Sequence, residues 1–291
     1  MQNVLDDSIG QWIDKAADDL ENILDAQVIT YYGAIYPAIT KPFRNFIEQI
    51  AQLDSKKDRL CIFIQSAGGS VETVEKLVNV IRHHYKEVWF FVPDMAMSAG
   101  TIFCMSGDKI YMDYSSSLGP IDPQIFNGQY WVPALGYLDK VEELVSKSRK
   151  GQLADAEMIF LQNQDLAQLR LYEQARDLSV ELLKLWLATY KFKDWAIHRT
   201  DALKIGSNVT ADEKRQRASE IAGMLSDNKL WHSHGRMIGL DTLRDKLRLE
   251  IDDYSNNKIL TSSVRWYHDM LTDYVDRQRL QSYLHHKEIK L

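Results

Sequence analysis

Two short segments of small residues carry the groups that acyl transfer requires. The first is residues 66–70 (SAGGS), and the second places Ser98 directly before Ala99. A serine hydroxyl attacks a carbonyl once a base removes its proton, and the oxyanion that forms needs N–H donors already in position. Ser98 is therefore the predicted nucleophile, and the predicted oxyanion donors are the backbone N–H groups around Gly68, Gly69 and Ala99. The structural alternative for Ser98 is a small residue that closes a tight strand-to-helix contact.

Each segment lies where a predicted strand turns into a predicted helix. Residues 60–64 and 88–92 are short runs of β-branched and aromatic residues, which are typical of buried strands. Because consecutive strands of a parallel sheet end at the same edge, the two turns would meet side by side. After the glycines, apolar residues recur at helical spacing at Val71, Val74, Leu77, Val78 and Ile81.

The rest of the chain predicts an α/β fold with a parallel sheet, right-handed crossovers, flanking helices and a mainly helical C-terminal part. Further strands are predicted at residues 27–35 and 109–112. The stretch 152–192 is longer than one core helix needs, so part of it would pack against another subunit or form a lid. Helical spacing predicts an amphipathic helix within residues 1–26 and further helices at 43–53, 134–150, 152–192, 210–224, 240–249 and 266–284.

Composition and charge are those of an ordinary soluble globular protein. The chain has 291 residues and a formal net charge of −6, which gives no argument for binding nucleic acid or an anionic membrane surface. No run approaches ~18 uninterrupted apolar residues, and the acidic N-terminus lacks the apolar core of a secretory signal. Cys61 and Cys104 lie in apolar patterns and are predicted to be buried, reduced thiols. A cytoplasmic location without a membrane span is therefore expected.

Two pairs of adjacent histidines, His83-His84 and His285-His286, raise the question of a metal site. Adjacent side chains on a helix cannot both face one ion, and no Cys or His-x-x-x-His spacing accompanies the pairs. No metal site is therefore predicted.

Three motifs in this order resemble the Clp protease and signal peptide peptidase superfamily: residues 66–71 (SAGGSV), 97–101 (MSAGT) and 118–124 (LGPIDPQ). Within that superfamily the chain is most similar to the serine dehydrogenase proteinase family, over residues 28 to 250. The resemblance implies a Clp/crotonase-like fold and a serine endopeptidase that acts on peptides or unfolded proteins. It also implies assembly into a homo-oligomer and no cofactor.

On this resemblance the chain divides into three parts. Residues 1–26 would be the N-terminal amphipathic helix, and residues 251–291 a C-terminal helical extension. Residues 27–250 would be the Clp/crotonase-like peptidase domain, with the helical insertion 152–192 inside it.

The resemblance offers more than one candidate for the base that would activate Ser98. Clp proteases carry a histidine on the segment that here is residues 119–123, but this chain has no histidine between positions 84 and 198. The resemblance to the serine dehydrogenase proteinase family implies instead a reordered triad, in which serine comes first in the chain, then aspartate, then histidine. In this chain that order corresponds to Ser98, Asp122 and His234, and triad geometry does not depend on chain order.

Two other bases and two other functions remain open. His232 lies two residues before His234, and on an extended segment both side chains would point the same way. Lys140 would stand for the lysine in the Ser-Lys dyads of the signal peptide peptidase branch, where it would have to be desolvated. The same fold also serves crotonase-type acyl-CoA enzymes, which need no serine, and a catalytically inactive interaction or scaffold protein is the other alternative.

Overall fold

The structure, a computed structural model, describes residues 4–122, 124–126, 131–199 and 203–289. Its core is a six-stranded sheet in which all neighbouring strands are parallel except the last pair, which is antiparallel. The fold is therefore α/β with a mostly parallel sheet, as predicted. Across the sheet the strands follow the order β10 (Asp252–Asp253), β5 (Lys109–Met112), β3 (Glu87–Phe91), β2 (Arg59–Gln65), β1 (Gln27–Gly33) and β11 (Ser282–His285).

The central strands are buried because their side chains are apolar on both faces. Every residue of β2 from Leu60 to Ile64 is buried, and its Phe63 stacks on Phe91 of β3 with ring centroids 4.8 Å apart. Parallel strands that are covered on both faces require such uninterrupted apolar runs. The strands predicted at 60–64 and 88–92 are confirmed.

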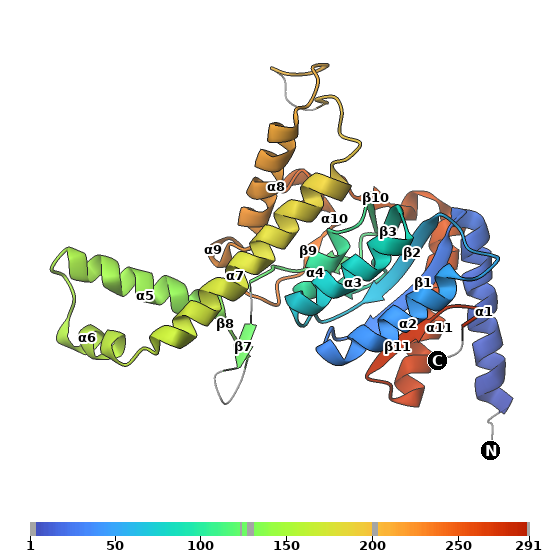
Figure 1. Cartoon of the computed structure of the whole chain (residues 1–291), viewed down its shortest axis with the longest axis horizontal. Coiled ribbons are helices and arrows are strands. Elements are labelled where there is room, and N and C mark those ends of the chain that lie inside the picture. The colour runs from blue at the N-terminus through green and yellow to red at the C-terminus, as the bar shows by residue number, and fades with distance from the viewer. Residues whose placement is uncertain (1–3, 123, 127–130, 200–202, 290–291) are drawn as a thin grey trace.

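Helices cover both faces of this sheet (Figure 1). One face packs against α2 (Thr40–Ala51), α3 (Val71–His84) and α4 (Ala99–Cys104), and the other against α1 (Val4–Leu24) and α11 (Lys258–Gln278). The helix predicted within residues 1–26 is confirmed as α1, while residues 1–3 lie outside the described part of the chain. The sheet thus separates two hydrophobic clusters, one including Phe43, Phe46, Leu77 and Phe103, and the other Ile13, Leu20, Val264 and Tyr267.

The C-terminal part departs from the helix predicted at 266–284. Helix α11 begins earlier and ends at Gln278, where Arg279 adopts a left-handed conformation with φ 54°. Strand β11 follows and pairs antiparallel with β1. The prediction was wrong here because the partner strand lies almost the whole chain length away, where local periodicity cannot report it. Since β10 and β11 both belong to the central sheet, the division of the chain at residue 250 stays a prediction.

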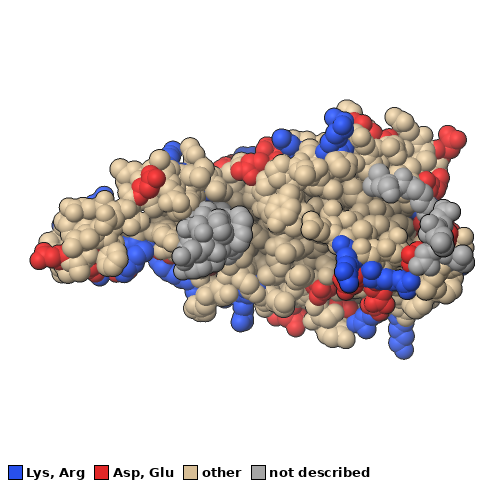
Figure 2. Space-filling view, turned by 90° about the horizontal axis from the view of Figure 1, so that it is seen from below, with Lys and Arg blue, Asp and Glu red and all other residues tan. Residues whose placement is uncertain are grey.

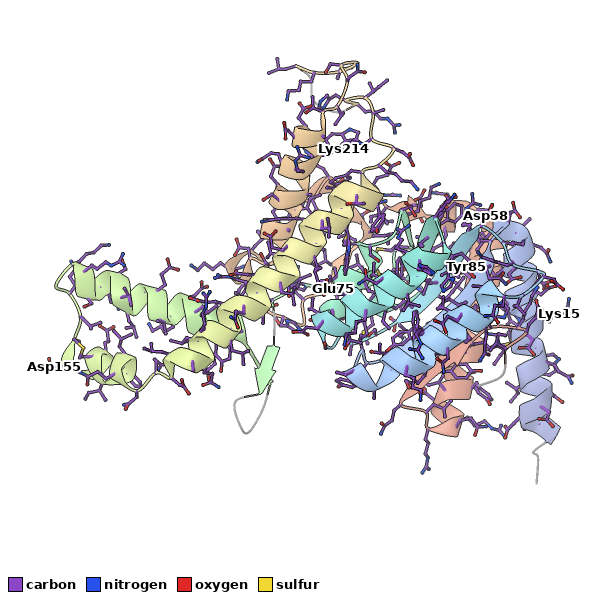
Figure 3. The ribbon with its side chains drawn as sticks, in the orientation of Figure 1. Lys15, Asp58, Glu75, Tyr85, Asp155 and Lys214 are labelled. Carbon is purple, nitrogen blue, oxygen red and sulfur yellow. The ribbon has the colours of Figure 1, made fainter. Side chains whose placement is uncertain are left out.

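Three helices form an arm that projects from the body: α5 (Ala134–Arg149), α6 (Asp155–Gln162) and α7 (Leu166–Trp186). Figure 3 shows Asp155 at the far end of this arm and Tyr85 within the body. The predicted helical stretch 152–192 is interrupted between α6 and α7, where the Asp165 side chain accepts hydrogen bonds that cap α7. Near the body α7 packs against α8 (Ala211–Leu225), which begins at the predicted capping box of Thr210 and Glu213.

Charged side chains of both signs are interspersed on the face that Figure 2 shows. Lys and Arg side chains lie near Asp and Glu there and do not form one continuous basic patch. Such a face gives no electrostatic argument for a nucleic-acid ligand. Among the helices of the described ranges, none is both long enough and apolar enough to cross a membrane.

Candidate active site

Ser98 lies at a sharp turn between a short strand and a helix. Strand β4 (Met95–Ala96) ends just before it, and Ser98 is the N-cap residue of α4. Its backbone has φ 52° and ψ −117°, a combination that residues other than glycine rarely adopt. The residue is half-buried, so part of it remains accessible to a substrate. Strained backbone of this kind clusters at functional sites, because the surrounding structure must hold it in place.

The glycine pair of the first motif lies where the structure leaves no room for a side chain. Gly68 has φ 106° and Gly69 has φ 148°, values that favour glycine. A Cβ on Gly68 would lie 2.9 Å from the Cβ of Ser98, and a Cβ on Gly69 would lie 2.1 Å from the carbonyl oxygen of Ile35. Ile35 fixes the pair by donating its N–H to the Gly68 carbonyl and accepting the N–H of Ser70, each at 2.8 Å. The two turns are therefore in direct contact.

The backbone N–H groups of Gly69 and Ala99, the residues predicted to donate to an oxyanion, have no acceptor among the described residues. The N–H of Gly68 is already occupied, since it donates to Ser66 Oγ at 3.1 Å. The N–H groups of Gly69 and Ala99 can therefore bind a developing negative charge without breaking an existing bond.

Asp122 and His234 are hydrogen-bonded although 112 residues separate them in the chain. Asp122 Oδ1 lies 2.6 Å from His234 Nδ1. Asp122 is only 2% exposed, whereas the His234 side chain is 18% exposed. With Nδ1 facing a carboxylate, Nε2 is the nitrogen available to accept a proton. This arrangement is the one in which a carboxylate orients a catalytic histidine.

A second sheet, with three strands, explains how these distant residues reach one place. Strand β4 pairs in parallel with β6 (Ser117–Leu118), which pairs antiparallel with β9 (Ile238–Gly239). Ser98 and Asp122 follow β4 and β6, whereas His234 precedes β9. Because β9 runs in the opposite direction, all three residues lie beyond the same end of this small sheet.

Of the two hydrogen bonds of a complete triad, the one between aspartate and histidine is present, and the one between serine and histidine is absent within the described ranges. None of the hydrogen bonds there joins Ser98 to His234, and Asp122 Oδ2 is buried without a partner. Catalytic hydrogen bonds are often long in substrate-free sites and tighten when substrate binds. The structure thus brings Asp122 and His234 together and places Ser98 at the same end of the sheet.

The family model for ClpP-like SDH-type serine proteinases matches residues 23–203, which is more than half of the chain. The chain belongs to this family. The match contains Ser98 and Asp122, while His234 lies beyond its end. Membership in the ClpP-like SDH-type family suggests serine peptidase activity.

Two uncharacterized proteins of Methanocaldococcus jannaschii are similar to this family member in sequence. One is 33% identical over 101 residues, which make up 35% of this chain and 35% of that protein. The other is 28% identical over 159 residues, which make up 54% of this chain and 50% of that protein. The chain thus spans no more than about half the length of the curated relatives it matches.

Two solved structures of the 1510-N membrane-bound stomatin-specific protease are also similar. A serine-to-alanine variant is 22% identical with a TM-score of 0.32, and the match covers 42% of this chain and 61% of that one. A lysine-to-alanine variant in complex with a substrate peptide is 23% identical with a TM-score of 0.33, covering 41% and 57%. A likeness this distant does not assign individual residues.

Lys140 does not have the environment that a Ser-Lys dyad requires. Its side chain is 60% exposed on α5, and its Nζ lies 3.0 Å from Glu143 Oε2. The desolvation that a catalytic lysine needs is therefore absent at this position.

His232 differs from His234 in backbone conformation and in contacts. It is exposed and ends the short helix α9 (Asn228–Trp231) with φ 62°, so the segment is not extended there. The extended segment on which both histidines would point the same way is therefore absent, and of the two it is His234 that contacts Asp122. Pro123, the next residue of the third motif, lies outside the described ranges.

The two cysteines and the pair His285-His286 make contacts that stabilise the fold. Cys61 and Cys104 are free and buried, as predicted, and burial raises the pKa of both thiols. His285 and His286 lie in a buried polar network that joins α1, β1 and β11. Within the part of the chain that the structure describes, no group of three or more His, Cys, Asp or Glu side chains could hold a metal ion.

Proposed function

We propose that the chain is a serine endopeptidase that cleaves peptide bonds in peptides or unfolded proteins. Ser98 attacks the scissile carbonyl while His234, oriented by Asp122, removes the hydroxyl proton. The N–H groups of Gly69 and Ala99 stabilise the oxyanion of the tetrahedral intermediate. No cofactor takes part in this mechanism.

The second half of the reaction uses the same groups. His234 gives its proton to the leaving amine, so the C–N bond breaks and an acyl ester remains on Ser98. A water molecule then attacks the ester as His234 takes its proton. Collapse of this second intermediate releases the carboxylate product and returns the proton to Ser98.

The hydrogen bond between Asp122 and His234 is the observation that carries this proposal. Two residues that the family resemblance paired are in contact at 2.6 Å, in a position set by the pairing of β6 with β9. The strained backbone at Ser98 and the glycine turn packed against it support the assignment of the nucleophile. Membership in a serine proteinase family supports the reaction class.

Labelling with a fluorophosphonate probe, followed by peptide mapping, tests the proposal. Wild type should be labelled at Ser98, and Ser98→Ala should not be labelled although it folds. Ser106→Ala is a matched control, because Ser106 is buried just after α4 and, among the described residues, its hydroxyl bonds only the Phe103 carbonyl, at 2.6 Å. A folded wild type that is not labelled would contradict the peptidase, and an interaction protein or an acyl-CoA enzyme would then replace it.

We also propose that the chain forms a homo-oligomer through its arm. Helix α6 exposes Ile159 by 60% and Phe160 by 66%, and α7 exposes Leu166 by 78%. Apolar side chains exposed together are typical of contact surfaces. Changing Ile159 and Phe160 to serine should lower the mass measured by sedimentation equilibrium, and a monomeric wild type would refute the proposal.

A further inference from the structure

Thr101, the last residue of the MSAGT motif, is completely buried between two turns of the proposed active site. Its hydroxyl lies 2.7 Å from the Ala96 carbonyl and 3.0 Å from the Gly119 carbonyl, so its one proton can be donated to either oxygen. The same oxygen accepts the N–H of Gly119 at 2.9 Å. One side chain therefore contacts three backbone groups on two segments that are distant in sequence, and its donated and accepted bonds together can join the two segments.

These two segments lead to different members of the proposed triad. Ala96 is the last residue of β4, and the chain runs from it through Met97 to Ser98. Gly119 directly follows β6, and the chain runs from it to Asp122. The last pair of residues in the ladder between these strands is Ala96 and Leu118. Beyond that pair, the Thr101 hydroxyl supplies the next connection between the two segments.

The two segments also lie close together at this point. A Cβ on Gly119 would lie 2.6 Å from Met97 Cε and 3.4 Å from Met97 Cα. Glycine thus leaves room for the Met97 side chain, and the threonine hydroxyl bonds to both segments beside it. A small shift of one segment would change the distance between the nucleophile and the pair of Asp122 and His234.

We infer that Thr101 is a positioning residue that sets the spacing between Ser98 and the Asp122–His234 pair. It contacts no reacting atom and acts only through the two segments it joins. Threonine suits this role because its branched Cβ limits side-chain rotation, so the hydroxyl is held in one direction. The inference rests on the proposed peptidase function.

Thr101→Val tests the inference, because it keeps the shape of the side chain and removes only the hydroxyl. Thr30→Val is the matched control: Thr30 is also completely buried, and its hydroxyl bonds Tyr267 Oη at 2.8 Å, within the polar network beneath α1. The measurements are the rate of Ser98 labelling by a fluorophosphonate, and kcat and KM for a peptide substrate. All are made well below the unfolding temperature of each variant.

Thr101→Val should lower the labelling rate and kcat by about 10- to 100-fold and leave KM unchanged, since a misplacement of about 1 Å costs this much. Thr30→Val should lower the unfolding temperature to a similar extent but keep the wild-type labelling rate. Thr101→Ser restores the hydroxyl and should recover most of the lost rate. If Thr101→Val does not fold, Thr101→Ala, which leaves room for water, takes its place with Thr30→Ala as its control.

Labelling of Thr101→Val at the wild-type rate would overturn the inference while leaving the peptidase proposal intact. An equal loss of rate in Thr30→Val would also overturn it, because general loosening of the fold would then explain the effect. A wild type that is never labelled would instead refute the proposed function on which the inference rests.

Discussion

Two of the pairs of a histidine and a carboxylate in the described part of this fold differ in their surroundings. Asp122 and His234 meet at the end of the small sheet, 2.6 Å apart. Glu21 and His286 meet beneath α1, 3.5 Å apart, where the first helix approaches the last strand. Both pairs join residues that are far apart in sequence, so both depend on the completed tertiary structure.

The carboxylate beneath α1 is fully engaged. Glu21 Oε1 accepts the side-chain amide of Gln27 at 2.7 Å and the N–H of Val28 at 3.0 Å, and Lys287 Nζ lies 2.8 Å from Oε2. Burial by itself raises the pKa of Glu21, but the bonds from His286, Lys287 and Val28 outweigh it and lower the pKa to about 2. Glu21 is therefore a fixed structural anion.

The carboxylate at the small sheet is engaged on one side only. Among the described residues, Asp122 Oδ2 has no hydrogen-bond partner, and His234 is the residue that Oδ1 contacts. When a carboxylate has one principal partner, a proton gained by that partner directly strengthens the attraction between the two groups. The comparison teaches that a carboxylate beside a histidine stabilises the fold when hydrogen-bond donors occupy both of its oxygens. When one oxygen is left without a donor, the same pair can take part in chemistry.

Asp122→Asn should give the largest effect and sharpen this contrast. The amide cannot hold His234 in the required tautomer, so kcat should fall on the order of 10⁴-fold. The unfolding temperature should change little, because Asp122 has few bonds to lose. Measuring kcat and thermal unfolding together checks both statements, and a variant with wild-type kcat would remove Asp122 from the mechanism.

Gly68→Ala should break the contrast by damaging activity and stability together. The added Cβ would lie 2.9 Å from both the Ser98 Cβ and the Met97 carbonyl oxygen, at a φ of 106°. We expect a loss of about 2–4 kcal/mol in the free energy of unfolding and slower labelling of Ser98. Gly151→Ala is the control, because Gly151 also has positive φ but nothing within 4 Å of an added Cβ. It should keep the wild-type labelling rate.

Glu21→Gln should lower stability without lowering activity. Because the folded pKa of about 2 lies below the ordinary value of 4.5, Glu21 stabilises the fold above about pH 4.5. That contribution, about 3 kcal/mol, is lost as the pH falls from 4.5 toward 2. Urea unfolding at several pH values should show that the variant is less stable at pH 7 and less sensitive to acid. The exposed Glu142→Gln should behave as wild type, and a fall in kcat of Glu21→Gln would contradict the separation of the two pairs.

Lys140→Ala should have the smallest effect of all. The pair of Lys140 with Glu143 is exposed and contributes little to stability, because solvent screens such pairs. Labelling of Ser98 should proceed at the wild-type rate. Loss of labelling in this variant alone would replace the triad with a Ser-Lys dyad.

The elements of the core could be predicted from the sequence because their signals are local. The apolar run of 60–64, the helical spacing after Val71 and the capping box at Thr210 each depend on neighbouring residues. The glycine turn could be predicted for the same reason, since positive φ restricts the residue type. Ser98 followed from its place between a strand and a helix.

The parts that escaped prediction depend on contacts across the chain. Strand β11 was hidden in a helical pattern because its partner, β1, is at the other end of the sequence. Arg279 ends α11 in a left-handed conformation without the glycine that usually signals such an end. His234 was preferred over His232 through the family resemblance alone, because its contact with Asp122 depends on the pairing of β6 with β9, which no local pattern contains.

The pairing of β1 with β11 also determines when the sheet can be completed as the chain is made. Strand β1 can join β2 early, but its other edge stays open until the residues of β11 have been synthesised. An open strand edge with apolar side chains is a template for pairing with other molecules, and contacts this distant in sequence form slowly. Pairing with other molecules through this edge during synthesis and refolding is therefore a hazard of this architecture.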